Sequence, residues 1–134
     1  MPTNPLEVAT LEVGAERYFQ DRLENGRFLI QRSRSSGEYV FYPRAVAPGT
    51  GTDDLEWVQP SGHGVVYSTT CVLASKTNPA TYNIAIVELA EGPRLLTRVI
   101  NIAPETVMIG MPVTAVIGRI DDKVLVLFTP ATSP

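Results

Sequence analysis

The sequence predicts a mainly β protein with an N-terminal helix, a short ribbon-like hairpin and a C-terminal five-stranded barrel. Three features predict this order: an amphipathic segment near the N-terminus, a stretch rich in turn residues after it, and five strand-like runs in the rest of the chain. A chain of 134 residues, 44% of them hydrophobic, can bury one core and carry a small appendage.

The segment 15–25 has the pattern of an amphipathic helix. Its apolar residues fall on one helical face: Ala15, Tyr18, Phe19 and Leu23. Gly26 provides a stop, since glycine accepts the left-handed conformation that ends many helices. A helix this short is marginal by itself, so its apolar face is expected to dock on the domain or on a partner.

Two short strands are expected at residues 27–31 and 38–42, with a turn at 33–37 between them. Residues 43–54 are expected to form a loop, because Gly, Pro, Thr and Asp are frequent there. The predicted divisions of the chain are a mobile arm and helix at 1–26, the ribbon at 27–56, the barrel at 57–130 and a tail at 131–134.

Five strand-like runs follow, at residues 64–75, 82–89, 94–102, 112–120 and 123–129. In the first run we expect one side to hold Val65, Tyr67, Cys71 and Leu73, and the other to hold Ser68 and Thr70. Residues 103–111 separate the third run from the fourth. A five-stranded Greek-key barrel often has a helix or a long connection there, so an OB-fold is the best match.

The hairpin and the loop after it have the layout of a zinc ribbon that has lost its ligands. A zinc ribbon would read Cys-x-x-Cys-Gly, a hairpin, and then Cys-Pro-x-Cys-Gly. The four ligand positions of this frame hold Ser33, Ser36, Ala47 and Thr50. Alanine has no ligand atom, and neutral hydroxyls bind zinc poorly beside thiolate, imidazole or carboxylate. We therefore expect a degenerate ribbon that holds no zinc.

Without metal, apolar contacts must hold the ribbon in place. Structural zinc supplies roughly 10–16 kcal/mol of apparent binding energy to zinc-finger peptides, so its loss is large. Four side chains are available to replace it: Phe28, Ile30, Tyr39 and Phe41.

Charge is distributed unevenly along this chain of net charge −3. Residues 15–45 carry six arginines against four acidic residues, whereas residues 46–134 carry five basic and eight acidic residues. The arginines are either a solvated face or a patch for a phosphate-bearing ligand or an acidic protein. The acidic balance makes nucleic acid an unfavourable partner.

The single cysteine, Cys71, precludes an intramolecular disulfide. No secretory signal is evident at the N-terminus, and no apolar stretch approaches the roughly 20 residues that span a bilayer. We therefore expect a cytoplasmic protein without a membrane partner.

No convincing set of catalytic residues is evident. His63 follows Ser61 closely, but neighbours in sequence rarely meet as nucleophile and base, and the glycines around His63 favour a turn. Glu88 and Glu91 flank a turn and are expected to be solvated. Cys71 alternates with apolar neighbours, as a buried small hydrophobe does. The sequence therefore favours a protein that is not an enzyme.

Six blocks of residues resemble a known family in their order and spacing. They are GRFLIQR at 26–32, PR at 43–44, DLEW at 54–57, SGHGVVYS at 61–68, VELAEGPR at 87–94 and IGMPV at 109–113. The chain resembles the acyl-CoA-associated OB-fold proteins that carry an N-terminal helix and a rubredoxin-like zinc ribbon. The resemblance runs from residue 18 to residue 130, and it departs from the family pattern at every ribbon ligand.

The resemblance implies an accessory role without catalysis. Members of this family look like subunits that stabilise a thiolase-like or related acyl-CoA-processing enzyme and help to shape its site for a CoA thioester. We expect Tyr18, Phe19 and Arg32 to contact such a partner, and Arg44 and Trp57 to contact the partner or acyl-CoA. Alternatively, Trp57 fills the joint between ribbon and barrel. Exposed partner surface would also permit a homo-oligomer.

Two other functions stay open. An OB-fold nucleic-acid-binding module would need basic residues and stacking aromatics on its binding strands. Beyond Trp57, the predicted barrel offers only Tyr67, Tyr82 and Phe128 as aromatics. A small stand-alone enzyme would need an acid, base or nucleophile set that the sequence does not offer.

Metal analysis of the purified protein tests the degenerate ribbon. We expect far less than one zinc per chain, because the four frame positions offer no strong ligand. A stoichiometric amount of zinc would mean that the ribbon frame is misaligned with this sequence.

Overall fold

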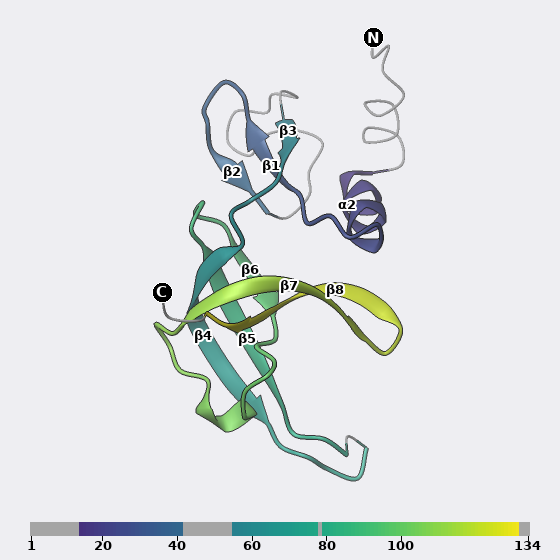
Figure 1. Cartoon of the computed structure of the whole chain (residues 1–134), viewed down its shortest axis with the longest axis vertical. Coiled ribbons are helices and arrows are strands. Elements are labelled where there is room, and N and C mark those ends of the chain that lie inside the picture. Colours follow the sequence, from purple (N-terminus) through teal and green to yellow (C-terminus); the bar gives the residue numbers. More distant parts are fainter. Residues whose placement is uncertain (1–13, 42–54, 78, 132–134) are drawn as a thin grey trace.

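A computed structural model describes residues 14–41, 55–77 and 79–131. Within these residues the chain is mainly β, with one N-terminal α-helix and a curled five-stranded antiparallel sheet (Figure 1). The predicted fold class, with its OB-type barrel, is therefore confirmed. The expected arm, the 43–54 loop and the last three residues of the tail lie outside the described residues.

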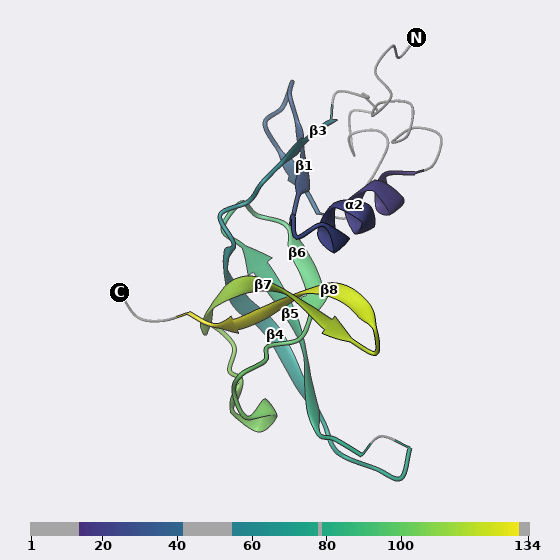
Figure 2. The same cartoon turned by 45° about the vertical axis from the view of Figure 1, so that its right-hand side comes forward.

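The elements form an N-terminal group and a barrel. The N-terminal group contains the helix α2 (Ala15–Glu24) and the strands β1 (Ile30–Ser33), β2 (Tyr39–Val40) and β3 (Leu55–Val58). The barrel contains β4 (His63–Val72), β5 (Tyr82–Leu89), β6 (Arg94–Thr97), the 3-10 helix η1 (Pro104–Thr106), β7 (Pro112–Ile120) and β8 (Lys123–Pro130). The N-terminal group stands at one end of the barrel, with α2 beside β8 (Figure 2).

Helix α2 has the face and the end that its sequence predicts. Ala15 and Leu23 are buried, and the other two apolar residues of the predicted face are half-buried. The helix ends at Asn25, whose side-chain amide donates a 2.8 Å hydrogen bond to the main-chain oxygen of Asp21. Gly26 follows with a positive φ of 82°, the left-handed conformation expected there.

The ribbon hairpin has a third strand that the sequence did not predict. β1 pairs with both β2 and β3, and Trp57 of β3 lies opposite Gln31 of β1. β1 begins at Ile30, three residues later than expected. The predicted boundary between residues 56 and 57 falls inside β3, so one strand connects the small sheet directly to the residues that lead into the barrel.

Apolar packing holds this small sheet as expected. Ile30 is fully buried in the main hydrophobic core. The other three side chains proposed to replace zinc, Phe28, Tyr39 and Phe41, pack against that core from partly buried positions.

The barrel closes where the strands at the two ends of the sheet, β6 and β8, meet. The sheet order is β6-β5-β4-β7-β8, and Val99, just after β6, forms a parallel bridge to Phe128 of β8. The amide of Ile100 donates to the oxygen of Phe128 at 2.7 Å, and the amide of Phe128 donates to the oxygen of Arg98 at 3.0 Å. η1 lies between the third and fourth barrel strands, where the OB-fold connection was expected.

Two buried polar side chains reinforce this closure. Asn83 of β5 donates to the hydroxyl of Thr69 at 2.6 Å and accepts from the amide of Val99 at 3.0 Å. The hydroxyl of Thr97 donates to the oxygen of Val126 at 2.9 Å. Because buried polar groups are costly when unpaired, these bonds fix the relative positions of β4, β5, β6 and β8.

The helix shares one core with the barrel. Leu23 belongs to the same buried cluster as Phe128, which is completely enclosed. The side-chain amide of Gln20 donates a 2.9 Å hydrogen bond to the main-chain oxygen of Val124. The helix near the N-terminus is therefore docked on the last strand of the chain.

The predicted sidedness of the first barrel strand is wrong. We expected Val65, Tyr67, Cys71 and Leu73 on one side, but the pairing of β4 with β5 shifts by one residue between Val66 and Ser68. As a result, Val65 lies opposite Glu88 on the outer face, whereas Cys71 lies opposite the buried Asn83. A bulge reverses the alternation of the side chains that follow it.

Gly64 offers a test of the packing between β4 and β5. A Cβ at this position would lie 2.7 Å from Cγ1 of Val87 and 2.8 Å from the main-chain oxygen of Glu88. Because a backbone atom moves only if the strand shifts, we expect Gly64→Ala to lower the free energy of unfolding by about 1–3 kcal/mol.

Gly118→Ala is the matched control for this substitution. Its Cβ would lie 2.8 Å from Cδ1 of Leu127, a side-chain atom that can rotate away. Urea titration of both variants measures the difference, and an equal or smaller loss for Gly64→Ala would contradict the expectation.

Candidate functional site

An aromatic cluster joins α2 to the small sheet. The rings of Tyr18 and Trp57 lie 4.7 Å apart between centroids, at an interplanar angle of 34°. Phe19 packs edge-on against Phe28 at 6.3 Å and against Phe41 at 5.6 Å. The structure therefore brings Tyr18, Phe19 and Trp57 together, and each of them contacts its own chain. Their expected contacts with a partner stay predictions.

Arg32 lies on the other side of the same sheet, among polar groups. Its guanidinium stacks over Tyr39 at 5.5 Å, donates to the oxygen of Gly37 and lies 3.8 Å from Glu56. Arg34 also approaches Glu56, at 3.4 Å. These pairs are partly exposed, so each contributes at most about 1 kcal/mol to stability.

Only half of the ribbon frame lies among the described residues. Ser33 is buried, and its hydroxyl accepts a 3.3 Å hydrogen bond from the amide of Ser36 within the β1–β2 turn. Ala47, Thr50 and Arg44 lie outside the described residues. In residues 14–41, 55–77 and 79–131, no three His, Cys, Asp or Glu side chains gather as metal ligands would. The expectation that the protein binds no zinc therefore stays a prediction.

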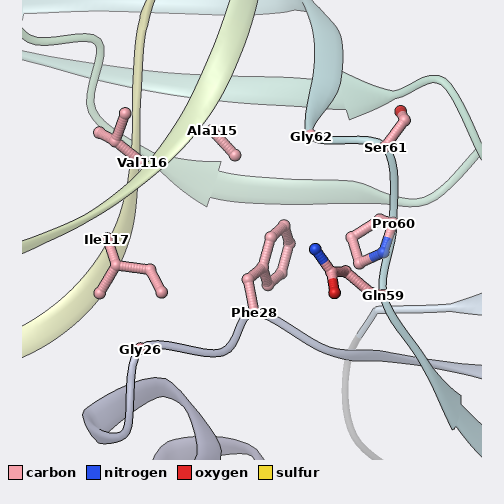
Figure 3. A pocket seen from close by; sticks show the side chains of 9 residues that line it. All are labelled: Gly26, Phe28, Gln59, Pro60, Ser61, Gly62, Ala115, Val116 and Ile117. Atoms are coloured by element: carbon pink, nitrogen blue, oxygen red, sulfur yellow. The ribbon is translucent and has the colours of Figure 1, made fainter.

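An open groove lies at the joint between the N-terminal group and the barrel (Figure 3). Its volume is about 380 Å³. The link from α2 to β1, the residues after β3, and β7 supply its lining: Gly26, Phe28, Gln59, Pro60, Ser61, Gly62, Ala115, Val116 and Ile117. None of these side chains carries a charge, so the groove suits an uncharged, largely apolar ligand segment.

The residues considered for catalysis are used in local structure. The hydroxyl of Ser61 accepts from the main-chain amide of His63 at 3.2 Å, so the two residues form a turn, as expected. Glu91 accepts a 2.8 Å hydrogen bond from the amide of Ser61. Cys71 is half-buried on the inner side of β4.

The outer face of the barrel carries an arginine held between an aromatic ring and a carboxylate. Arg94 lies 3.7 Å from the ring centroid of Tyr67 and 2.9 Å from a carboxylate oxygen of Glu88. The hydrogen bond to Glu88, helped by Tyr67, raises the pKa of Arg94 above its ordinary value. Three neighbouring strands thus contribute one side chain each to this contact.

A second arginine stacks further along the same strands. Arg98 lies 4.0 Å from the ring centroid of Tyr82. Tyr67 and Tyr82 were expected among the barrel aromatics, but their stacks with arginine were not predicted. The sequence did contain a signal for a covered outer face, because the outward-facing positions of β5 include Ile84 and Ile86. Apolar residues on both faces of a strand are typical of strands covered on both sides.

Among the residues described, no helix is long and apolar enough to cross a membrane.

Known proteins share this arrangement. The model of the C-terminal OB-fold domain of ChsH2 matches residues 57–118. A DUF35 domain-containing scaffold protein of Pyrococcus furiosus is 32% identical over 122 residues, which cover 84% of this chain and 86% of that protein. The chain belongs to the DUF35 family of scaffold proteins. The family expected from the sequence is therefore confirmed.

Further relatives of this DUF35 protein include a second scaffold protein and a longer chain. A DUF35 domain-containing scaffold protein of Methanocaldococcus jannaschii is 35% identical over 95 residues, which cover 68% of this chain and 67% of that protein. A probable enoyl-CoA hydratase alpha subunit of Thermomonospora curvata is 39% identical over 90 residues, which cover 65% of this chain but only 28% of that longer protein.

Solved structures agree with this assignment. A chain of an Ltp2-ChsH2(DUF35) aldolase superposes with a TM-score of 0.74 and 28% identity, and the match covers 98% of this chain and 100% of that chain. A DUF35 family protein of Sulfolobus solfataricus superposes with a TM-score of 0.65 at 15% identity, which shows a shared fold.

Trp57 fluorescence tests the joint between α2 and the small sheet. Trp57 is the single tryptophan of the chain, and it stacks on Tyr18. We expect Tyr18→Ala to expose the indole, shift its emission to longer wavelength and destabilise the protein by about 1–3 kcal/mol. Arg17→Ala, on the exposed side of α2, is the control. Unchanged emission in Tyr18→Ala would contradict the stack.

Proposed function

We propose that this DUF35 protein is a non-catalytic accessory subunit of an acyl-CoA-processing enzyme with a thiolase fold. The observation that carries the proposal is its match along 98% of its length to a chain of the Ltp2-ChsH2(DUF35) aldolase. Two relatives that are named scaffold proteins support the same role. The relative named as a hydratase subunit shares only 28% of its length with this chain, so the catalytic part of that protein is expected to lie elsewhere.

The chemistry of the described residues supports a role without catalysis. The carboxylates that a reaction would use are engaged in structural contacts: Glu56 with two arginines, Glu88 with Arg94, and Glu91 with the amide of Ser61. These contacts engage at least one oxygen of each carboxylate, whereas Oε1 of Glu91 is buried without a hydrogen-bond partner among the described residues.

A contact with the CoA thioester belongs to the same proposal. The groove of Figure 3 lies within the usual range of about 300–1,000 Å³ for ligand sites, and its lining is uncharged. The pantetheine arm of CoA is an uncharged chain with amide groups. Phe28, Pro60 and Ile117 supply apolar walls for such a chain, and the amide of Gln59 supplies a hydrogen-bonding partner.

Co-purification tests the proposed function. We expect the tagged full-length chain, purified from its native source, to bring down a thiolase-fold enzyme, and we expect its addition to change the rate of that enzyme on an acyl-CoA. The proposal fails if no such enzyme is recovered and the protein neither binds CoA nor alters an acyl-CoA reaction.

A further inference from the structure

The outer face of β4, β5 and β6 carries several apolar side chains: Val65, Tyr67 and Leu96 are exposed, and Ile84 and Ile86 are half-buried. Ile84 and Ile86 point outward at the centre of the face. Leu96 lies opposite Ile86 across the β5–β6 pair and is 72% exposed. An antiparallel sheet that faces water normally presents polar side chains there. We call this surface the barrel face; it is formed by Val65, Tyr67, Tyr82, Ile84, Ile86 and Leu96, with the polar Ser68 and Thr70 and the charged Glu88, Arg94 and Arg98 among them.

The apolar surface continues past β4. The connection that follows η1 runs along this strand, because Gly110 donates to the oxygen of Val66 at 2.8 Å and the amide of Val66 donates to Met111 at 3.0 Å. The segment that holds Met108 and Ile109 therefore lies along the edge of β4, and both are among the most exposed large apolar residues described. Contiguous exposed apolar surface of this kind marks interaction sites.

The charges of the barrel face are not balanced. Glu88 neutralises Arg94, whereas none of the ion pairs formed among the described residues includes Arg98. The face therefore carries one positive charge in excess, on a chain whose net charge is −3. Stacking on Tyr82 holds the guanidinium of Arg98 in place, so it is prepared to receive a carboxylate.

We infer that the barrel face is the surface through which this protein docks onto its enzyme partner, which presents apolar side chains and a carboxylate opposite Arg98. The inference rests on the proposed function and adds the surface and its chemistry. Arginine and tyrosine beside an apolar centre are the residues that most often dominate binding energy at interfaces.

A second copy of this chain fits the barrel face less well. Three strands about 4.8 Å apart, over five residues of about 3.3 Å each, give a face of roughly 240 Å². A stable interface needs about 800 Å² from each partner. Two identical faces would also bring like charges together. The area is too small for any partner by itself, so the barrel face is one part of a larger contact, and the repulsion between like charges favours a different protein over a second copy.

Photo-crosslinking of the full-length chain in its native cells tests the inference. A photoreactive amino acid replaces Leu96 in one variant and Leu73 in the other; these residues are 72% and 73% exposed, but Leu73 lies beyond the last paired residue of β4. We expect the probe at position 96, and not the probe at position 73, to crosslink to the acyl-CoA-processing enzyme.

Charge variants give a second readout with the enzyme recovered by co-purification. We expect Leu96→Asp and Arg98→Gln each to weaken its binding by about tenfold or more, while Leu73→Asp stays within about twofold of the unmodified chain. Because the residue at 96 is exposed, the thermal unfolding midpoint of Leu96→Asp should be unchanged, which separates lost docking from lost folding.

Four outcomes of these experiments would overturn the inference. If the enzyme co-purifies but neither variant at 96 or 98 weakens its binding, the proposed function survives and the barrel face is not the docking surface. If the probe at 96 joins only two copies of this chain, the face is a self-interface. If Leu96→Asp instead abolishes oligonucleotide binding at low salt, the face binds nucleic acid. If no acyl-CoA-processing enzyme is recovered, the proposed function and this inference fail together.

Discussion

Closure of the barrel between β6 and β8 is the constraint on which the rest of the structure depends. Four antiparallel pairings order the five strands, and the bridge between Val99 and Phe128, with the hydrogen bond from Thr97 to Val126, joins the two ends of the sheet. Closure removes two edges that would otherwise offer unpaired backbone groups. It also places Phe128 at the centre of the core, where no part of it is exposed. Once the inner side chains are fixed in this way, the alternate residues must point outward.

The N-terminal group depends on that closed barrel for its position. Leu23 and Ile30 enter the barrel core, and the small sheet packs on α2 through the stack of Tyr18 on Trp57. Aromatic packing therefore connects this segment to α2 and to the barrel core. These aromatic side chains already contact one another. Among the described residues, the barrel face therefore exposes more apolar surface than the aromatic cluster does.

The sequence predicted those parts of the fold in which local pattern and tertiary packing agree. β5 and β7 have the bounds expected, and α2 has the expected apolar face. β3 was missed because a run of four residues is too short to show a clear strand pattern by itself. Their strand character comes from pairing with β1, a contact across more than twenty residues.

The candidate surfaces were harder to predict for a physical reason. A bulge in β4 reverses the sides of its residues, and nothing in a single sequence marks its position. The apolar run in β5 has the same pattern whether its outer face is covered by the same chain or by another protein. Only the closed barrel distinguishes Ala85 and Val87, which are buried, from Ile84 and Ile86, which are not. The role of Arg44 was inferred from resemblance and lies outside the described residues.

The packing of α2 on β8 has a consequence for folding during translation. The helix leaves the ribosome before β8, and the residue that Gln20 contacts, Val124, lies 104 residues later in sequence. During translation, the helix therefore cannot reach its docking strand until those residues have emerged. A nascent chain that stops short of β8 would leave exposed the part of α2 that packs against this strand, and exposed apolar surface is what chaperones and proteases recognise in unfinished chains.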